Sequence, residues 1–224
     1  MDTKENKSNV NMSGNFKTTD EEIEVVRAFL DREKIPYERI YKYEDANAGD
    51  VMVRFPNKFY SLFEVKRESQ ERFNKFGEYG IDFISSLVFK KGVDKKKWKK
   101  LHQPKDLPEF MKSLDVKHPR FKWGKLGYSY SNVWLFYVQD EKTKEYTHLE
   151  CYDGKKLGSK IMFDYLKTKC PFTVNIKPES QMSHADSFDS ATFYIKPSAL
   201  ARAKTTKDNI YNHGDMGILE MLEM

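Results

Sequence analysis

The first patterned stretch of the chain repeats apolar residues at the interval of a helix. From Thr19 onward, Ile23, Val26 and Leu30 recur every three or four positions, which is the spacing of one helix face. Pro36 ends the pattern, because proline has no amide hydrogen to donate inside a helix. We therefore expect a first helix between about residue 18 and Pro36.

After Pro36 the apolar spacing shortens and becomes typical of β-strands. Short apolar or alternating runs predict strands at 37–43, 50–55, 59–66, 80–89, 132–139, 147–152 and 191–195, and one more helix at 156–169. Residues 56–58, Pro-Asn-Lys, separate the second and third strands, as the loop of a short hairpin does. This order of elements predicts an α/β fold with a mixed central β-sheet flanked by helices.

The 224 residues suit a single domain with tails at both ends. Residues 1–17 are polar with almost no apolar periodicity, and we interpret them as a flexible N-terminal tail. The domain is expected at 18–203, with a basic insertion at about 90–125. Residues 204–224 are expected to form a C-terminal tail.

Composition constrains the class of protein. The chain has 39 Lys and Arg against 34 Asp and Glu, and its 39% of hydrophobic residues is enough for a core. No apolar run approaches the roughly 20 residues of a membrane span, and the polar N-terminus lacks the apolar segment of a secretion signal. The two cysteines, Cys151 and Cys170, form neither a disulfide framework nor a zinc site. We expect a cytoplasmic protein that does not contact membranes.

One pair of charges lies inside an apolar strand. Glu64 and Lys66 belong to the run SLFEVK, and strand alternation places them on the same face. If the hairpin turns about residues 56–58, the numbers of opposed residues sum to about 114, so Asp50 lies opposite Glu64. Facing carboxylates repel each other, and a hard cation such as Mg²⁺ suits two carboxylates and water. The alternatives are a turn acid at Asp50 and a solvent-facing ion pair between Glu64 and Lys66.

The first helix offers a third acid. At about 100° per residue, Glu22 falls inside the apolar arc of the helix, whereas Asp20, Glu21 and Glu24 fall outside it. An acid directed at the core is informative, because acids are rarely buried. The alternative is a capping box in which Glu22 pairs with Thr19. Both interpretations stay open.

Asp50, thirteen intervening residues and then Glu64-Val65-Lys66, on a hairpin after an acid-bearing helix, resemble the motif of the PD-(D/E)xK nuclease superfamily. The resemblance implies a restriction-endonuclease-like core and a Mg²⁺-dependent deoxyribonuclease, with Mn²⁺ as a substitute metal. It implies that Asp50, Glu64 and Lys66 are catalytic. The two carboxylates hold the metal with Glu22, and the lysine orients or activates the attacking water.

The basic insertion is a candidate for nucleic-acid binding. Residues 90–100 contain seven lysines and one tryptophan. Lysines contact phosphates and tryptophan stacks on bases, so we predict contacts from Lys95, Lys96, Lys97, Trp98, Lys99 and Lys100. A second segment has the same mixture at Arg120, Lys122, Trp123 and Lys125. The alternative for both is a solvated basic face.

The function expected from these features is hydrolysis of DNA phosphodiester bonds by an endonuclease of the restriction, recombination or phage genome-processing type. DNA is the expected partner, and a homodimer is expected if both strands are cut. One alternative is a non-catalytic nucleic-acid-binding protein on a nuclease-like fold. The other is a structural or interaction protein, which would show no salt-dependent affinity for DNA.

Overall fold

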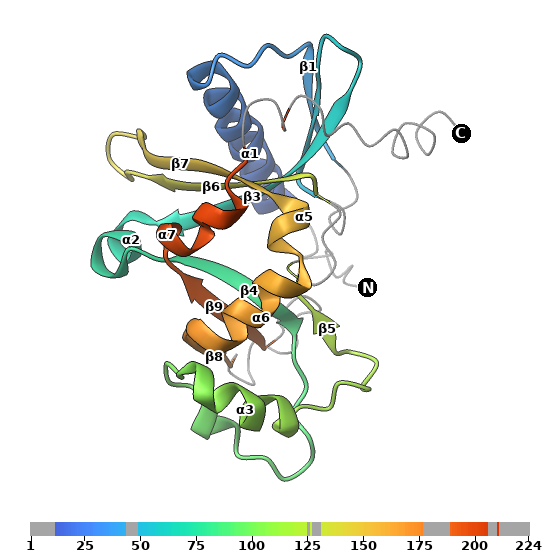
Figure 1. Cartoon of the computed structure of the whole chain (residues 1–224), viewed down its shortest axis with the longest axis vertical. Helices are drawn as coiled ribbons and strands as arrows, with labels where there is room; N and C mark the ends of the chain where they lie inside the picture. Colours follow the sequence, from blue (N-terminus) through green and yellow to red (C-terminus); the bar gives the residue numbers. More distant parts are fainter. Residues whose placement is uncertain are drawn as a thin grey trace, which may run out of the picture.

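Two β-sheets organise the chain, one in the upper half and one in the lower half of Figure 1. The computed structural model describes residues 12–43, 49–124, 126, 131–176, 189–205 and 210, except for the side chains of residues 12–20 and 202. Sheets and helices together make a mixed α/β fold. This class of fold was predicted, and the arrangement in two sheets was not.

The first sheet has five strands in the order β1-β2-β3-β6-β7. These strands are β1 (Arg39–Lys42), β2 (Val51–Arg54), β3 (Tyr60–Ser69), β6 (Val133–Gln139) and β7 (Tyr146–Asp153). β3 and β6 run parallel, whereas the other neighbouring pairs are antiparallel. Because β3 lies in the middle of this sheet, the residues at its centre are buried on both faces.

The β2–β3 hairpin has the predicted register. Val51 pairs with Phe63 and Arg54 pairs with Tyr60, so the paired residue numbers sum to 114. The loop closes at the predicted residues 56–58, where the Phe55 amide donates to the Phe59 carbonyl at 2.9 Å. A short loop and a two-residue alternation are local signals, which is why the sequence predicts this hairpin well.

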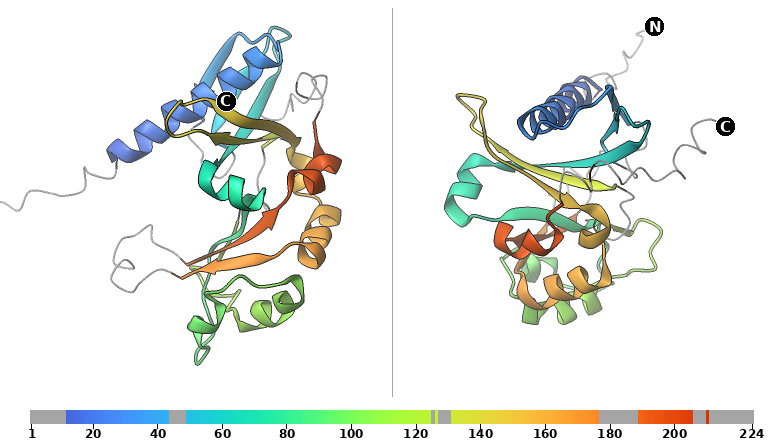
Figure 2. Two further views of the ribbon diagram at one scale, coloured as in Figure 1. Left: turned by 90° about the vertical axis from the view of Figure 1, so that its left-hand side faces the viewer. Right: turned by 45° about the horizontal axis from the view of Figure 1, so that its top comes forward.

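Helix α1 (Met12–Arg32) covers one face of the first sheet, as the right-hand view of Figure 2 shows. Val26, Phe29 and Leu30 are buried in an apolar cluster that also contains Phe63 of β3. The helix therefore packs against the β3 face that carries the odd-numbered side chains.

Helix α1 begins earlier than the pattern predicts. Thr19 lies inside the helix, so the capping-box interpretation of Thr19 and Glu22 is wrong. A threonine in a helix interior costs less than about 1 kcal/mol, so the residue favours a cap without enforcing one. Residues 12–17 of the predicted tail are helical, and residues 1–11 lie outside the described residues.

The second sheet has four antiparallel strands in the order β5-β4-β9-β8. These are β4 (Tyr79–Ser86), β5 (Lys122–Trp123), β8 (Phe172–Asn175) and β9 (Ser190–Ile195). The sequence predicts β4 and β9 but not the short strands β5 and β8. The sequence also predicts a single sheet, because the residues of β4 and β9 contain no local signal that shows which strands they pair with.

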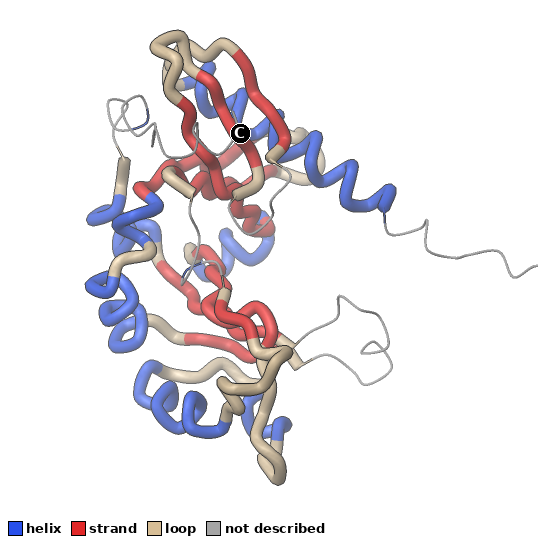
Figure 3. The backbone as a smooth tube through the Cα atoms, turned by 90° about the vertical axis from the view of Figure 1, so that its right-hand side faces the viewer, coloured by secondary structure: helices blue, strands red, loops and turns tan. Residues whose placement is uncertain are grey.

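One apolar cluster joins the two sheets, which lie one above the other in Figure 3. Trp134 and Phe136 of β6 belong to this cluster together with Phe83 of β4 and Phe193 of β9. The Phe83 and Phe193 rings are stacked, with centroids 4.1 Å apart. The face of the first sheet opposite α1 is therefore directed toward the second sheet.

Short helices complete the fold. They are α2 (Gln70–Phe76), α5 (Gly154–Leu157), α6 (Lys160–Lys169), α7 (Pro197–Leu200) and the 3₁₀ turn η5 (Ala201–Ala203). The helix predicted at 156–169 is divided in two, because the Ser159 hydroxyl accepts a hydrogen bond from the Met162 amide at 3.2 Å and caps a new helix.

Most of the segment that follows β4 forms a lobe at the lower end of Figure 1, where α3 lies, and its last part returns to the second sheet as β5. It contains η2 (Lys95–Trp98), η3 (Pro104–Asp106), α3 (Leu107–Ser113) and β5. The Trp98 and Phe110 rings, both buried, lie 5.1 Å apart and hold η2 against α3. We call residues 88–124 the basic lobe, and they correspond to the predicted basic insertion.

Part of the predicted C-terminal tail contacts the domain. Ile210 is buried in the cluster beneath α1, and its carbonyl accepts a hydrogen bond from the Ser61 hydroxyl at 3.0 Å. Residues 206–209 and 211–224 lie outside the described residues. Among the described helices, none combines the length and the apolar character that crossing a membrane requires.

Candidate functional site

Glu64 is a charged side chain in the centre of the first sheet. It lies on β3 between two neighbouring strands, and 0% of it is exposed to solvent. Removing a carboxylate from water costs several kcal/mol, which only a good partner offsets. Apolar packing does not explain a buried acid at this position. Glu64 is therefore the starting point of the candidate site.

Lys66 is the ion-pair partner of Glu64. It lies on the same face of β3, with 29% of its side chain exposed and its Nζ 5.7 Å from the centre of the Trp134 ring. The strand alternation predicted this shared face. Glu64 is buried and Lys66 is only partly exposed. The two therefore do not form an ion pair that faces solvent, which was the alternative interpretation of this pair.

Asp50 forms hydrogen bonds with the two residues of β3 that precede and follow Glu64. Its backbone amide donates to the Phe63 carbonyl at 2.8 Å, and its Oδ2 accepts the Val65 amide at 2.7 Å. The side chain of Asp50 therefore takes a position in the β2–β3 hydrogen-bonding pattern just before β2 begins. The two contacts fix the Asp50 carboxylate at the Val65 amide, one residue after Glu64, and the strand pairing itself begins at Val51 and Phe63.

Glu22 lies on α1, which packs on the opposite face of the first sheet from Trp134 and Lys66. Its neighbour Glu21 contacts the sheet: Tyr137 donates its hydroxyl hydrogen to Glu21 at 3.2 Å, and Arg67 pairs with the same oxygen at 3.0 Å. Glu21, which the pattern placed outside the apolar arc of the helix, makes these polar contacts and keeps 29% of its side chain exposed. The role of Glu22 as a metal ligand stays a prediction.

The surroundings of Tyr137 raise the pKa of its hydroxyl. Burial raises the pKa of its hydroxyl, and the nearby Glu21 carboxylate raises it further. The phenol therefore stays protonated and acts as a donor to Glu21. This contact ties α1 to β6 and supports the sheet from the side opposite Lys66.

The two carboxylates of Asp50 and Glu64 are too few to complete the coordination shell of a metal ion, so water or substrate would have to supply the remaining ligands. Among the described residues, no group of three or more His, Cys, Asp or Glu side chains is arranged to hold a metal ion. Mg²⁺ commonly binds through one or two carboxylates and completes its shell with water and substrate phosphates. Asp50 and Glu64 carry the hard oxygen donors that Mg²⁺ prefers, and their joint binding of Mg²⁺ stays a prediction.

The lysine-rich turn is exposed, but its tryptophan is not. Trp98 is 2% exposed and packs in the core of the basic lobe. It cannot stack on a base in this arrangement, so its predicted contact with nucleic acid is wrong. The indole is buried because Phe110, supplied by the later helix α3, covers it, and a local sequence pattern does not contain that information.

The lysines around Trp98 divide into two groups. Lys95 lies 3.8 Å from the buried Asp189, and Lys97 pairs with Glu109. Lys96, Lys99 and Lys100 are exposed, and no ion pair is recorded for them in the part of the chain that the structure describes. Their contact with nucleic acid stays a prediction.

A polar cluster that the sequence pattern did not predict lies on the same sheet face as Lys66. Phe136 pairs with Lys66 on one side and with Glu150 on the other. Tyr79 and Tyr152 both donate to Glu150 Oε2, at 3.1 and 2.7 Å. Burial and the Glu150 charge raise the pKa of both phenols, so they remain donors. Alternation along β7 is the signal that could have placed Glu150 on this face.

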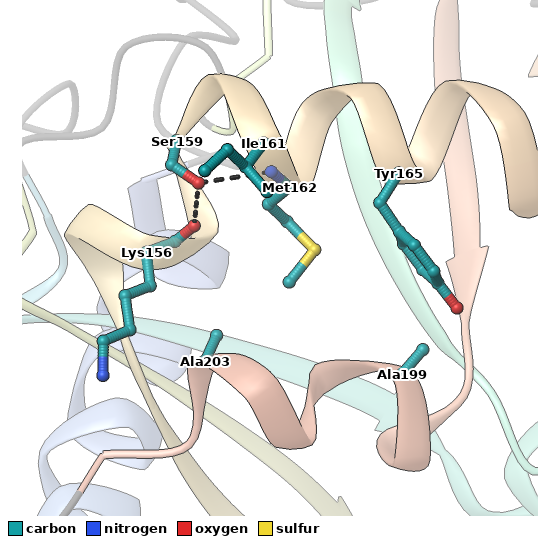
Figure 4. Close-up of a pocket in the computed structure, with 7 residues that line it drawn as sticks. All are labelled: Lys156, Ser159, Ile161, Met162, Tyr165, Ala199 and Ala203. Carbon is teal, nitrogen blue, oxygen red and sulfur yellow. Dashed lines mark hydrogen bonds between the residues drawn. The ribbon is translucent and has the colours of Figure 1, made fainter.

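A separate cavity of about 190 Å³ lies between α6 and the α7–η5 segment (Figure 4). Its walls are mainly apolar, with Met162 and Tyr165 facing Ala199 and Ala203. The residues that line it include no Asp, Glu or His. It therefore offers no carboxylate or imidazole to bind a metal ion, and Asp50, Glu64 and Lys66 remain the candidate site.

Comparisons with models of protein families, with curated proteins and with solved structures gave no match. The candidate site therefore rests on its own geometry.

Proposed function

We propose that this chain is a metal-dependent nuclease that hydrolyses DNA phosphodiester bonds. The observation that carries the proposal is the fully buried Glu64, paired with Lys66 on the same strand face and flanked by the anchored Asp50. The hairpin that bears these residues follows an acid-bearing helix, which supports a restriction-endonuclease-like core.

Each residue has a distinct role in the proposed reaction. Asp50 and Glu64 would hold Mg²⁺, which when bound lowers the pKa of a coordinated water and polarises the phosphoryl oxygen. Lys66 places a positive charge where the phosphate gathers negative charge, and it can orient the attacking water. The Lys66 side chain is 29% exposed and its Nζ lies 5.7 Å from the centre of the Trp134 ring, which leaves the side chain accessible to a phosphate.

The test is cleavage of DNA by the purified full chain. Supercoiled, linear and single-stranded DNA are incubated with Mg²⁺, Mn²⁺ or EDTA, and the products are separated on gels. Lys66→Ala should lower the cleavage rate at least about 100-fold, because it removes the charge next to the reacting phosphate. Lys160→Ala, at an exposed lysine of α6 (90% exposed side chain), is the matched control and should cut like the wild type.

A folded Lys66→Ala variant that cuts as fast as the wild type would refute the site. Glu64→Gln provides a second variant, since it keeps the shape of the side chain and removes the metal-binding charge. Cleavage that survives EDTA would refute the dependence on metal.

The second candidate function is nucleic-acid binding without cleavage. It is favoured by the basic lobe, where twelve Lys and Arg accompany four Asp and Glu in residues 88–124. Salt-dependent binding with no cutting of any substrate, and with no effect of Lys66→Ala, would favour this function. A homodimer, proposed for cutting both strands, is tested by the mass of the chain in solution with and without DNA.

A further inference from the structure

The positive charge of the chain is concentrated in the basic lobe. Residues 88–124 carry a net charge of +8, whereas the whole chain carries +5. The rest of the molecule is therefore slightly negative. A local excess of this size attracts polyanions and releases their counterions on binding.

One tryptophan is exposed within this charged surface. Of the three tryptophans in the chain, Trp98 and Trp134 are each 2% exposed, whereas Trp123 is 41% exposed. Trp123 lies on β5 at the edge of the second sheet, next to the exposed Lys122. A partly exposed indole among cationic side chains offers an aromatic face for stacking next to groups that bind phosphates.

The backbone around Trp123 is held firmly. The Ser85 hydroxyl donates to the Trp123 carbonyl at 2.9 Å, and the buried Ser86 hydroxyl donates to the Arg120 carbonyl at 2.6 Å. The Gly124 amide donates to the Phe83 carbonyl at 2.8 Å. Each of these contacts joins the β5 segment to β4, so the indole projects from a fixed edge.

Two further contacts limit movement of this edge. A Cβ at Gly124 would lie 2.1 Å from the Asp82 carbonyl oxygen, so the backbones pack too closely for any side chain there. The Phe121 ring meets the Trp123 ring edge-on, with centroids 5.1 Å apart. A rigid aromatic surface loses little conformational entropy when a ligand stacks on it.

We propose that the β5 edge binds an unpaired nucleic-acid strand, with a base stacked on Trp123 and phosphates held by Arg120 and Lys122. Single-strand binding combines aromatic stacking with basic side chains along the backbone. The bases of a duplex are already stacked on each other, so a duplex can use the charge of this edge but not its indole. The link to cleavage rests on the proposed function and makes a single-stranded segment the substrate class.

Binding is measured in EDTA, so that no metal-dependent cleavage interferes. The probes are a labelled oligothymidylate of about 15 nucleotides, within the range of single-strand binding sites, and a duplex of the same length. Trp123→Ala should weaken oligothymidylate binding about tenfold, the size expected when a base loses its aromatic partner. Trp123→Phe keeps a ring and should retain most of the affinity.

The control variant is Ile161→Ala, which removes another exposed apolar side chain (82% exposed) on α6. It should bind like the wild type. In the wild type, oligothymidylate should protect tryptophan fluorescence from iodide quenching, because Trp123 is the indole that solvent reaches most. This second measurement needs no variant and decides the question if Trp123→Ala fails to fold.

The outcomes for binding and cleavage are separable. Unchanged affinity in Trp123→Ala, equal affinity for duplex and single strand, or no iodide protection would overturn the stacking proposal. If the wild type still cuts DNA with Mg²⁺ in that case, the proposed function stands alone. Stacking without any metal-dependent cleavage would leave this inference in place and remove the nuclease.

Discussion

Glu64 and Lys66 form one ion pair, yet the two side chains differ in their access to water. Glu64 is fully buried, whereas 29% of the Lys66 side chain is exposed. Removing the lysine leaves a carboxylate in a low-dielectric interior, whereas neutralising the glutamate leaves an ammonium that reaches solvent. The two halves of the pair should therefore contribute unequally to stability.

Lys66→Ala should lower the free energy of unfolding by about 2–3 kcal/mol, and Glu64→Gln should lower it by less than about 1 kcal/mol. The measurement is the midpoint of urea unfolding, with the slope of the transition checked for constancy. Lys160→Ala, in an exposed pair with Asp164, should change stability by less than about 0.5 kcal/mol. Equal losses in both variants of the buried pair would contradict the asymmetry.

The elements that the sequence predicted well are those formed by near neighbours. The β2–β3 hairpin, which carries Glu64 and begins just after Asp50, has a three-residue loop and an alternation that are visible in the sequence. The second sheet differs, because β5 has two residues and pairs with β4 across the whole basic lobe, and β8 has only four residues. Their pairing is decided by packing in the joint core rather than by local propensity.

The same distinction applies to the side chains of the site. Lys66 could be placed beside Glu64 from alternation alone. The burial of Trp98 by Phe110 and the contact of Glu21 with Tyr137 depend on how helices pack on remote strands. The hairpin acids could therefore be placed from the sequence, whereas the burial of Trp98, one of the two tryptophans considered for nucleic-acid contact, could not.

The ends of β6 and β7 support β3 through a short series of hydrogen bonds. The Gly154 amide donates to the Asn132 carbonyl at 2.8 Å, and Asn132 Oδ1 accepts the Leu62 amide at 3.0 Å. Leu62 is two residues before Glu64, so these bonds position the strand that carries the acid.

Gly154→Ala should be strongly destabilising. A Cβ there would lie 1.9 Å from the Ser131 carbonyl oxygen, so backbone must move, at a cost of about 3 kcal/mol. Gly92→Ala is the comparison, because Gly92 has a φ of 84° but open space around it, and its cost should be about 1 kcal/mol. Thermal unfolding of both variants checks this order, and a smaller loss at Gly154 would mean that the two strand ends separate easily.

At the scale of the whole molecule, the candidate site and the basic lobe belong to different parts of the fold. Asp50 and Glu64 lie on or beside strands of the first sheet, whereas the lobe contributes β5 to the second sheet, and its helix α3 lies at the other end of Figure 1 from β1 and β2. A substrate that uses both must extend along the molecule. In that case the lobe would determine how tightly the chain binds DNA, and the residues of the hairpin would determine the rate of cleavage.

This division predicts that removing lobe charges raises KM and leaves kcat unchanged, because the lysines would bind substrate and transition state equally. Lys99 and Lys100 are exposed and suited to the test. Changing both to alanine should weaken DNA binding and reduce the salt dependence of binding by about 0.7 per lost phosphate contact on single strands. Cleavage at saturating DNA should keep its wild-type rate.

The matched control changes Lys142 and Lys160, two exposed lysines outside the lobe, to alanine and has the same net charge. If both double variants weaken binding equally, the net charge of the chain attracts DNA and the lobe has no special part. If the lobe variant loses kcat as well, the lysines contact the reacting phosphate, and the separation between binding surface and reaction site is wrong. A rise in KM confined to the lobe variant, with an unchanged kcat, is the result that this architecture requires.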